Sequence, residues 1–546
     1  MSSDKSFFRR HKFISTLGIL FVVVLLCLAG FVFWRMRGPY RSYRLDFVKT
    51  GSGAPGVLEV GVAKRDITPN LALYDVLNDV DNDNKYRPAT GLLSHIDAAK
   101  GPDTFEDRNG NRKFDPVWMA GFGNDRPAKG VHDQIWARAI AFRNNGVTVA
   151  MVTLDAIGLF HEKVIDIRLR IDPGLKVDHV IVACLHNHET PDTMGNWSGL
   201  VPTPWSFDHA NMERVKNACK EAVEEAVQKL EPAEMRGSTY ELNPEGFVTD
   251  TRTPIVIDTK LNCVRFTRPG TDETIATLVN WGNHPETLGG NNPFITSDFC
   301  GYWRDGVEQG VPEPNGVKGL GGMCLYFQGM VGGLATQLDI EVPHRDGTRK
   351  FKEDSFEKAE ALGQNLAIKT VNALRGAEVW KEENPRVSVA AKTIYAPISG
   401  LFRYAIMLGL VHPGVFWPFN ARTEVDVVRV GDLEILTVPG ELYPEIADGG
   451  IESPQGADFY PLAPVEVPPL RKDLMNGKMR MVFGLANDEI GYIIPKSQFD
   501  AVPPHAYEPG GQYGEMNSAG SGVAPVIHHE AMALLNRMHD ALKDAK

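Results

Sequence analysis

Cysteine and positive charge are both scarce in this sequence. The 546-residue chain has six cysteines, and no two of them form a CxxC pair. The pattern therefore excludes a disulfide-stabilised framework and a zinc finger, and we expect the cysteines to be small buried side chains. Acidic residues outnumber basic ones and give a formal net charge of −12. This charge argues against a nucleic-acid-binding protein, because such binding depends on Lys and Arg side chains that neutralise phosphates.

The sequence also lacks low-complexity tracts and internal repeats with a period of roughly 20–50 residues, which argues against a repeat protein. Apolar residues make up 43% and charged residues 23% of the chain, close to the average of soluble globular proteins. This composition excludes a disordered chain and a membrane protein with many spans. Because a domain typically holds about 100–200 residues, the length predicts one large domain with sub-lobes, or two to three domains.

The longest apolar run lies near the N-terminus, where no charged residue occurs from Phe13 to Trp34. As a helix, a run of this length reaches roughly 33 Å, enough to cross a hydrocarbon core of about 30 Å. A cleaved signal peptide is the alternative, but no small-x-small cleavage site follows the run. We therefore predict a cytoplasmic tail at 1–12, a single transmembrane anchor at 13–35 and a linker at 36–56. Basic side chains flank the run equally on both sides, so they do not give its orientation.

After the linker, apolar β-branched runs alternate with amphipathic helical patterns. The patterns predict strands at 147–154, 180–185, 276–280, 433–438 and 480–485, and helices at 210–230, 356–374 and 527–542. Strands that alternate with helices indicate the α/β class. We predict a mixed sheet covered by helices, within a domain at 57–546.

Residues 75–117 look like an insertion into this domain and contain two acidic loops. The second loop places oxygen-bearing side chains at alternate positions around a central glycine, the pattern of a calcium loop. These side chains belong to Asp107, Asn109, Asn111 and Asp115. The terminal Glu of an EF-hand is missing, and a solvated turn rich in Asp and Asn is the alternative interpretation. Both interpretations stay open at this point.

Several apolar runs far apart in the chain each lead into polar side chains that can bind a metal. The runs lead into HNHE at 186–189, WGNHP at 281–285, PGE at 439–441 and ANDEIGY at 486–492. In open α/β sheets, ligands bind at the carboxyl ends of strands, so we expect one shared metal site at those ends. His186 and His188 lie two residues apart, which places both imidazoles on one face of an extended chain. Two imidazoles and a carboxylate are typical zinc ligands, although a histidine taken alone is more often a structural hydrogen-bonding residue.

Short motifs follow one another in a specific order along residues 57–546. They are VGVAKRDITP at 60–69, MAGFG at 119–123, GVHD at 130–133, HNH at 186–188, WGNHP at 281–285, PGE at 439–441, and AND followed by GY within 486–492. In this order they resemble the motifs of the neutral/alkaline non-lysosomal ceramidase family and its bacterial relatives. The resemblance implies that residues 57–546 form a ceramidase-like catalytic domain.

The resemblance also implies roles for individual residues in a zinc-dependent amide hydrolysis by metal-activated water. The residues that match the family's zinc ligands are His186, His284, Glu441 and Tyr492. His188 matches a histidine that transfers a proton beside the metal, and Arg252 matches an arginine that holds the substrate. A further tyrosine polarises the amide carbonyl in the family; Tyr513 is the nearer match and Tyr507 the second.

The implied substrate is an N-acylated, ceramide-like lipid, and the family's action on extracellular substrates would place residues 45–546 outside the cytoplasm. Two departures put ceramide itself in doubt, because Gly333 and Ala335 stand where the family has an acid and a serine. Three functions stay open: a membrane-anchored zinc amidase, a zinc hydrolase for esters or for sugar or peptide amides, and a non-catalytic anchored binding module. Retention of all four matched ligands argues against the third, since binding alone would not need them.

Overall fold

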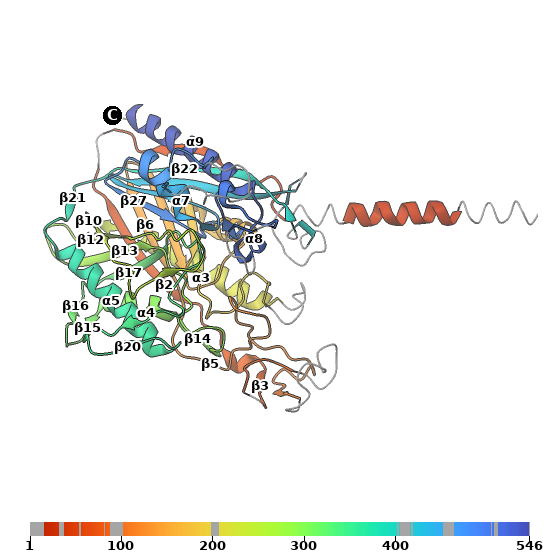
Figure 1. Ribbon diagram of the computed structural model, residues 1–546. Coiled ribbons are helices and arrows are strands. Elements are labelled where there is room, and N and C mark those ends of the chain that lie inside the picture. Colours follow the sequence, from red (N-terminus) through yellow and green to blue (C-terminus); the bar gives the residue numbers. More distant parts are fainter. Residues whose placement is uncertain are drawn as a thin grey trace, which may run out of the picture.

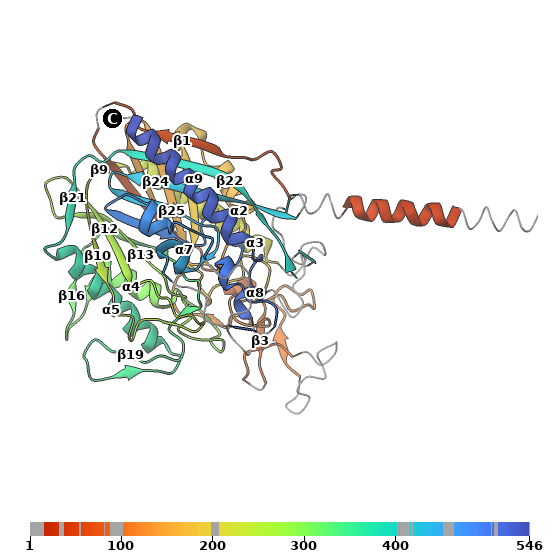
Figure 2. The ribbon, with the colours of Figure 1, turned by 45° about the horizontal axis from the view of Figure 1, so that its top comes forward.

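Three β-sheets carry the fold in the computed structural model of this protein (Figures 1 and 2). The structure describes residues 16–31, 38–53, 56–80, 82–87, 102–197, 207–400, 403–404, 415–416, 419–450, 464–503, 505–506 and 512–544. The fold is mixed α/β, as the alternation of strand and helix patterns predicts. The strands are nevertheless distributed over three sheets, where the sequence patterns predicted one.

The first sheet has the strand order β8-β7-β6-β2-β9, and two helices pack on its outer face. Its elements are β2 (Glu59–Asp66), β6 (Trp136–Asn144), β7 (Val147–Leu154), β8 (His179–Cys184), β9 (Glu231–Pro232), α2 (His161–Arg170) and α3 (His209–Gln228). Helix α3 begins at Asp208, whose side chain accepts a hydrogen bond from the backbone N–H of Asn211. Small residues such as Ala222 and Ala226 recur at helical spacing, so one face of α3 lies closely on the sheet.

The second sheet has the strand order β17-β13-β12-β10-β21, and α4 and α5 cover its outer face. Its elements are β10 (Glu234–Glu241), β12 (Lys260–Thr267), β13 (Thr274–Trp281), β17 (Met323–Gln328), β21 (Trp380–Glu382), α4 (Asp298–Glu308) and α5 (Phe356–Arg375). Ser355 caps α5 by accepting a hydrogen bond from the backbone N–H of Lys358. The indole of Trp303 on α4 donates to the hydroxyl of Thr370 on α5, which ties the two covering helices together.

The third sheet has the strand order β1-β22-β24-β25-β27, with β23 paired to β24. Its elements are β1 (Asp46–Thr50), β22 (Val387–Pro397), β23 (Val415–Phe416), β24 (Asn420–Val430), β25 (Leu433–Thr437), β27 (Met479–Phe483) and the covering helix α9 (Val523–Asp544). Figure 2 shows α9 lying along β22 and β24. β1 falls within residues 36–56, the segment that the sequence patterns assign to a linker, and it forms the edge of this sheet.

The inner faces of the three sheets share one hydrophobic core. Phe142 of the first sheet contacts Phe266 of the second, with ring centroids 5.2 Å apart, and Phe327 of the second stacks on Phe483 of the third at 4.4 Å. Strands such as β7 are therefore buried on both faces, between this core and the helices outside. Each sheet also contains one parallel pair, namely β7-β8, β13-β17 or β25-β27. The carboxyl ends of these pairs carry the loops that form the site described below.

Short elements connect the sheets and complete the loops. They are β3 (Val76–Asn78), β4 (Thr104–Glu106), β5 (Gly130–Val131), β11 (Thr249–Asp250), β14 (Phe294–Ile295), β15 (Gly310–Val311), β16 (Val317–Lys318), β18 (Ala335–Thr336), β19 (Val342–Pro343), β20 (Lys350–Phe351), β26 (Glu441–Leu442), β28 (Tyr492–Ile493), α7 (Pro444–Asp448), α8 (Tyr513–Met516), 3-10 turns at Leu71–Leu73, Pro173–Leu175 and Lys496–Gln498, and a π-helical turn at Leu470–Leu474. The parallel pair β26-β28 sets Glu441 beside Tyr492.

The predicted membrane anchor at residues 13–35 is wrong. Within the described part of the chain, no helix combines the length and the apolar character needed to cross a bilayer. The described helical residues there are 16–31, which extend about 24 Å, less than a hydrocarbon core of about 30 Å. The predicted localisation as a single-pass membrane protein, with a membrane contact through 13–35, is wrong for the same reason.

Candidate metal and active site

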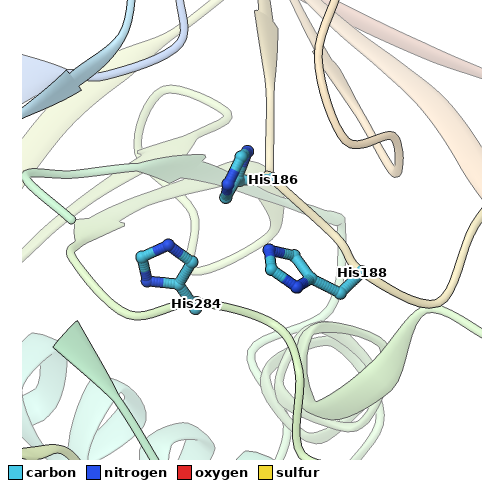
Figure 3. Close-up of side chains that lie close together, drawn as sticks. All are labelled: His186, His188 and His284. Atoms are coloured by element: carbon cyan, nitrogen blue, oxygen red, sulfur yellow. The ribbon is translucent and has the colours of Figure 1, made fainter. Parts of the chain in front are cut away.

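Three histidines from two strand ends converge at the carboxyl ends of the parallel pairs. His186 and His188 follow β8, and His284 follows β13. Their ring centroids lie 4.9, 5.1 and 5.5 Å apart, and Figure 3 shows the three rings grouped around one point. One ligand atom from each lies within 4.8 Å of the others. His186 has a φ of 61°, so a turn at this residue shapes the segment that carries both imidazoles, rather than simple strand alternation.

Backbone carbonyls fix the protonation of two of these histidines. The Nδ1 of His186 donates a hydrogen bond to the carbonyl oxygen of Ile157 at 2.8 Å, and the Nδ1 of His284 donates to that of Ala335 at 2.6 Å. A carbonyl oxygen can only accept, so each Nδ1 carries a proton and Nε2 is the nitrogen that faces the cluster. This is the arrangement in which histidines bind metals, with the second nitrogen held by a hydrogen bond.

Glu441 places its carboxylate beside the Nε2 atoms of both histidines. Its Oε2 lies 3.0 Å from the Nε2 of His284 and 3.6 Å from the Nε2 of His186. Burial raises the pKa of Glu441, but attraction to the two imidazoles and hydrogen bonds from His284 and Tyr492 outweigh it and lower the pKa below its ordinary value. Burial likewise opposes the charged form of His284, while its hydrogen bond to Glu441 and the nearby acids raise its pKa to about 9. The four predicted ligands thus meet in one place, although they come from three sheets.

His188 lies beside this cluster and makes different contacts. Its Nδ1 is 3.3 Å from Oε2 of Glu286, a residue that also accepts a hydrogen bond from the hydroxyl of Thr336. Burial, and then the neighbouring imidazoles, lower the pKa of His188 well below its ordinary value, so the ring is neutral at pH 7. Gly121 packs directly on this ring: a Cβ there would lie 2.4 Å from the Cβ and Cγ of His188. The site therefore includes Glu286 and Gly121 as supports for His188.

A mainly apolar cavity of about 350 Å³ extends from the histidines. Its wall includes Ile157, Phe160, Trp197, Ile490 and Ala519. His186, His188, Glu441 and Tyr492 lie in the same lining, together with Tyr513 and Glu489. Such a shape and composition suit a small molecule with an apolar chain.

The two residues predicted to contact the substrate have different positions. Tyr513 lines the cavity, with its ring centroid 6.2 Å from that of Tyr492, whereas Tyr507 lies outside the described residues. Arg252 is absent from the described cavity lining: its guanidinium donates to Oε1 of Glu515 at 2.7 Å and to the carbonyl oxygen of Gln498 at 2.8 Å. The structure thus brings Tyr513 to the site and places Arg252 behind the helix that carries Tyr513.

A second group of side chains that could bind a metal is already paired with an arginine. His179, Glu424 and Asp426 are buried together below the site. Arg168 donates to both carboxylate oxygens of Glu424, at 2.9 and 2.6 Å, and His179 contacts Asp426 at 3.0 Å. The guanidinium already occupies the place and supplies the charge that a cation would, so this group is a buried ion-pair network.

The acidic loop gives the calcium prediction no support. One carboxylate oxygen of Asp107 accepts hydrogen bonds from the backbone N–H groups of Gly110 and Asn111, and the other accepts one from Arg112. The amide of Asn111 donates to Asp115 at 2.6 Å. Among the described residues, the groups able to hold a metal do not include this loop. The oxygen-bearing side chains therefore belong to a turn in which they accept hydrogen bonds from the backbone N–H groups of the same loop.

Sequence reasoning missed three parts of the site. Glu286 directly follows the WGNHP motif of His284, but nothing in the pattern connects it to His188. The carbonyl oxygens of Ile157 and Ala335 orient the histidines through backbone atoms, so no side-chain pattern could reveal them. The hydrogen bond to His284 uses the backbone carbonyl of Ala335. The alanine that stands here in place of the family's serine therefore keeps this hydrogen bond.

Comparisons with known proteins bear on the family resemblance and on the fold. Residues 113–333 match the sequence model of the family described as neutral/alkaline non-lysosomal ceramidase, N-terminal. The crystal structure of neutral ceramidase from Pseudomonas aeruginosa is similar, with a TM-score of 0.59 and 14% identity over 90% of this chain and 75% of that chain. A ceramidase complexed with C2 gives a TM-score of 0.57 and 13% identity over 89% and 75%. No curated protein sequence matches the chain significantly. The resemblance inferred from the motifs is confirmed, and the solved structures establish the shared fold.

Proposed function

We propose that this chain, a relative of the neutral/alkaline non-lysosomal ceramidases, is a zinc-dependent hydrolase that cleaves the amide bond of an N-acylated, lipid-like molecule. The observation that carries the proposal is the donor set, in which two imidazole Nε2 atoms face one buried carboxylate. The family match over residues 113–333 supports hydrolysis of an amide. The apolar cavity beside the donor set supports a substrate with an acyl chain.

The residues present fit a zinc ion. His186 and His284 each offer an Nε2 atom on a ring whose orientation is already fixed, Glu441 offers a carboxylate, and Tyr492 offers an oxygen beside it. When bound, zinc would lower the pKa of a water molecule toward about 7 and polarise a carbonyl group. The deep burial of Glu441 and the histidines keeps competing water away from these groups.

His188 is suited to move a proton during the reaction. Its ring is neutral, and both nitrogens lack hydrogen-bond partners among the described residues, so one can take a proton from water and pass it to the leaving amine. Glu286 beside Nδ1 stabilises the charged ring that results. The hydroxyl of Tyr513, in the same cavity, is suited to donate a hydrogen bond to the developing oxyanion.

Metal analysis with matched variants tests the proposal. The purified chain should contain about one zinc per molecule and hydrolyse a short N-acyl amide, and a chelator should abolish both. The His186→Ala and His284→Ala variants should lose the metal and the activity together. The exposed His209→Ala variant is the control and should keep both. Stoichiometric zinc in a double His186→Ala, His284→Ala variant would exclude this ligand set, and faster cleavage of a matched ester would favour the alternative substrate class.

A further inference from the structure

A smaller cavity, of about 100 Å³, is bounded by α7 and by the turn at Lys496–Gln498. Its described lining has four side chains that carry oxygen, namely those of Glu445, Glu466, Ser497 and Gln498. The rest of that lining consists of proline, glycine, isoleucine and valine, and it includes no lysine or arginine. The cavity therefore has two carboxyl groups and no cation in its described wall.

Three oxygens in this wall are buried and unused. Glu445, Glu466 and Gln498 are 8%, 4% and 1% exposed. Within the described part of the chain, Oε2 of Glu445, Oε2 of Glu466 and Oε1 of Gln498 have no hydrogen-bond partner. One buried acceptor without a donor is unfavourable, and such groups are rare in folded proteins. Three of them around one cavity indicate a ligand that attracts oxygen.

Two hydrogen bonds hold these side chains in place. The Nε2 of Gln498 donates to Oε1 of Glu445 at 3.1 Å, which joins α7 to the turn. The backbone N–H of Lys496 donates to Oε1 of Glu466 at 3.2 Å, which fastens this carboxyl group to the same turn. Each unused oxygen is thus the second polar atom of a group whose first polar atom is fixed. Side chains that are fixed in this way lose less conformational freedom when they bind a ligand.

Basic side chains outside the lining do not balance the two acids. The charges of Arg252 and Lys496 favour the ionised forms of Glu445 and Glu466, respectively. Arg252 already donates to Glu515, however. Burial outweighs both attractions and raises the pKa of Glu466, and it raises the pKa of Glu445 to about 7. A counter-charge inside the cavity would remove this penalty.

The donor atoms select the kind of ligand. The four side chains offer carboxylate, amide and hydroxyl oxygens, and none offers an imidazole nitrogen or a thiolate. Such a set suits a hard cation rather than zinc. Calcium accepts an irregular arrangement of oxygens completed by water, whereas magnesium requires a nearly regular octahedron and releases its water reluctantly. Two carboxylates also balance the charge of one divalent cation.

We infer a second metal site, which binds one calcium ion through the side-chain oxygens of Glu445, Glu466, Ser497 and Gln498. The site shares no residue with the proposed zinc site or with the acidic loop at 107–115, and it does not depend on the proposed hydrolase function. α7 follows closely after Glu441, and the carbonyl oxygen of Gln498 accepts a hydrogen bond from Arg252, which also holds Glu515 of α8. Calcium bound here joins the segment that carries Glu441 to the segment that supports α8.

Equilibrium dialysis against radiolabelled calcium tests the site in the full chain with equimolar zinc present, at a pH above the pKa of Glu445. The parent should bind one calcium ion with a Kd of about 10⁻⁵–10⁻³ M, and magnesium should bind at least about 10-fold more weakly. Glu445→Gln and Glu466→Gln each remove one charge while keeping the shape, so each should weaken calcium binding at least about 10-fold.

Three control variants should bind calcium as the parent does. Glu245→Gln removes an equal charge from an exposed loop. Asp107→Asn changes the acidic loop, and His186→Ala changes the proposed zinc site. The last control separates the two metal sites, because it should lose zinc and keep calcium.

Thermal unfolding provides a readout whose sign depends on calcium. Without calcium, Glu466→Gln should melt at the parent's temperature or above it, because it removes a buried acid that lacks a counter-charge. With calcium at about ten times its Kd, the parent should gain a few degrees and the variant should not. The order of the two melting temperatures should therefore reverse when calcium is added.

Four results would overturn the inference: no calcium bound by the parent, equal affinity for magnesium, parental calcium affinity in both glutamine variants, or loss of binding in Asp107→Asn, which would place the ion in the acidic loop. If a glutamine variant does not fold, Gln498→Met decides instead, since it removes the amide oxygen at similar volume. It should weaken calcium binding, and parental affinity in this variant would exclude the site.

Discussion

Replacing His188 with alanine separates metal binding from proton transfer. His188 lies within the group of three histidines, yet its Nδ1 faces Glu286, whereas the Nε2 atoms of His186 and His284 face Glu441. If His188 moves a proton, its loss should lower kcat about 10²–10⁴-fold, which corresponds to roughly 3–5 kcal/mol in the activation barrier. The zinc content should stay near one per chain, because the proposed ligands remain.

The stability of this variant should change little. The imidazole of His188 borders the cavity, and its described packing contacts are with the rings of His186 and Phe122, at 4.9 and 5.1 Å, and with the backbone of Gly121. The variant should therefore lose about 1 kcal/mol of unfolding free energy, within the range of ordinary substitutions. Zinc measured by mass spectrometry, kcat/KM on one N-acyl amide and a thermal unfolding curve provide the three readouts. Loss of zinc comparable to that in His186→Ala would show that His188 is a ligand, and an unchanged rate would remove it from the chemistry.

Three further predictions concern other parts of the molecule. Gly121→Ala should displace the His188 ring, destabilise the fold by roughly 1–3 kcal/mol and lower kcat with zinc retained, while Gly123→Ala, whose Cβ meets nothing within 4 Å, should do neither. Tyr513→Phe removes only a hydroxyl and should lower kcat about 10–10³-fold at constant zinc content and stability; a parental kcat would show that Tyr513 does not polarise the carbonyl. Burial lowers the pKa of His161 to about 4, below an unfolded value of about 6.5, so its contribution of roughly 3 kcal/mol is complete above pH 6.5 and is lost as the pH falls to 4. Urea unfolding of His161→Gln should show a smaller loss of stability over that pH range than the parent, and an equal loss would contradict this prediction.

The strands and helices that the sequence patterns predict are present in the fold, for a reason visible in the packing. The predicted strand at 147–154 coincides with β7, and the predicted helix at 356–374 is one residue shorter than α5. β7 lies between the shared core and the helices, so both of its faces are apolar and its sequence is an unbroken apolar run. The helices expose one face, and their apolar residues therefore recur at helical spacing.

The arrangement of the elements could not be predicted in the same way. Strand patterns show that a segment is buried but not which strand lies beside it, and β13 pairs with β17 more than 40 residues further along the chain. One sheet was therefore predicted where the described residues form three large ones. The N-terminal error has a similar origin, since an apolar run indicates a membrane span by composition alone, and the described helix there is shorter than the run.

Asn487 shows how a motif residue can serve the site without belonging to it. Its side-chain oxygen accepts a hydrogen bond from the N–H of Val182 in β8 at 3.0 Å, and its amide donates to Asp426 in β24 at 2.6 Å. It therefore joins the first and third sheets directly beneath the strand ends that carry the histidines and Glu441. The backbone φ of Asn487 is 65°, in the left-handed region. Glycine adopts this conformation without strain, whereas alanine is strained in it.

A pair of variants at position 487 separates the effect of the side-chain hydrogen bonds from the effect of the left-handed backbone. Asn487→Gly should lower the free energy of unfolding by about 2–4 kcal/mol, because Val182 and Asp426 each lose a buried partner. Asn487→Ala should lower it by about 1 kcal/mol more, since alanine adds the backbone strain to the same loss. Urea unfolding of both variants, followed by zinc analysis, measures the two steps. Parental stability in Asn487→Gly would show that the two sheets do not depend on this residue, and equal stability of the two variants would show that the left-handed turn carries no cost.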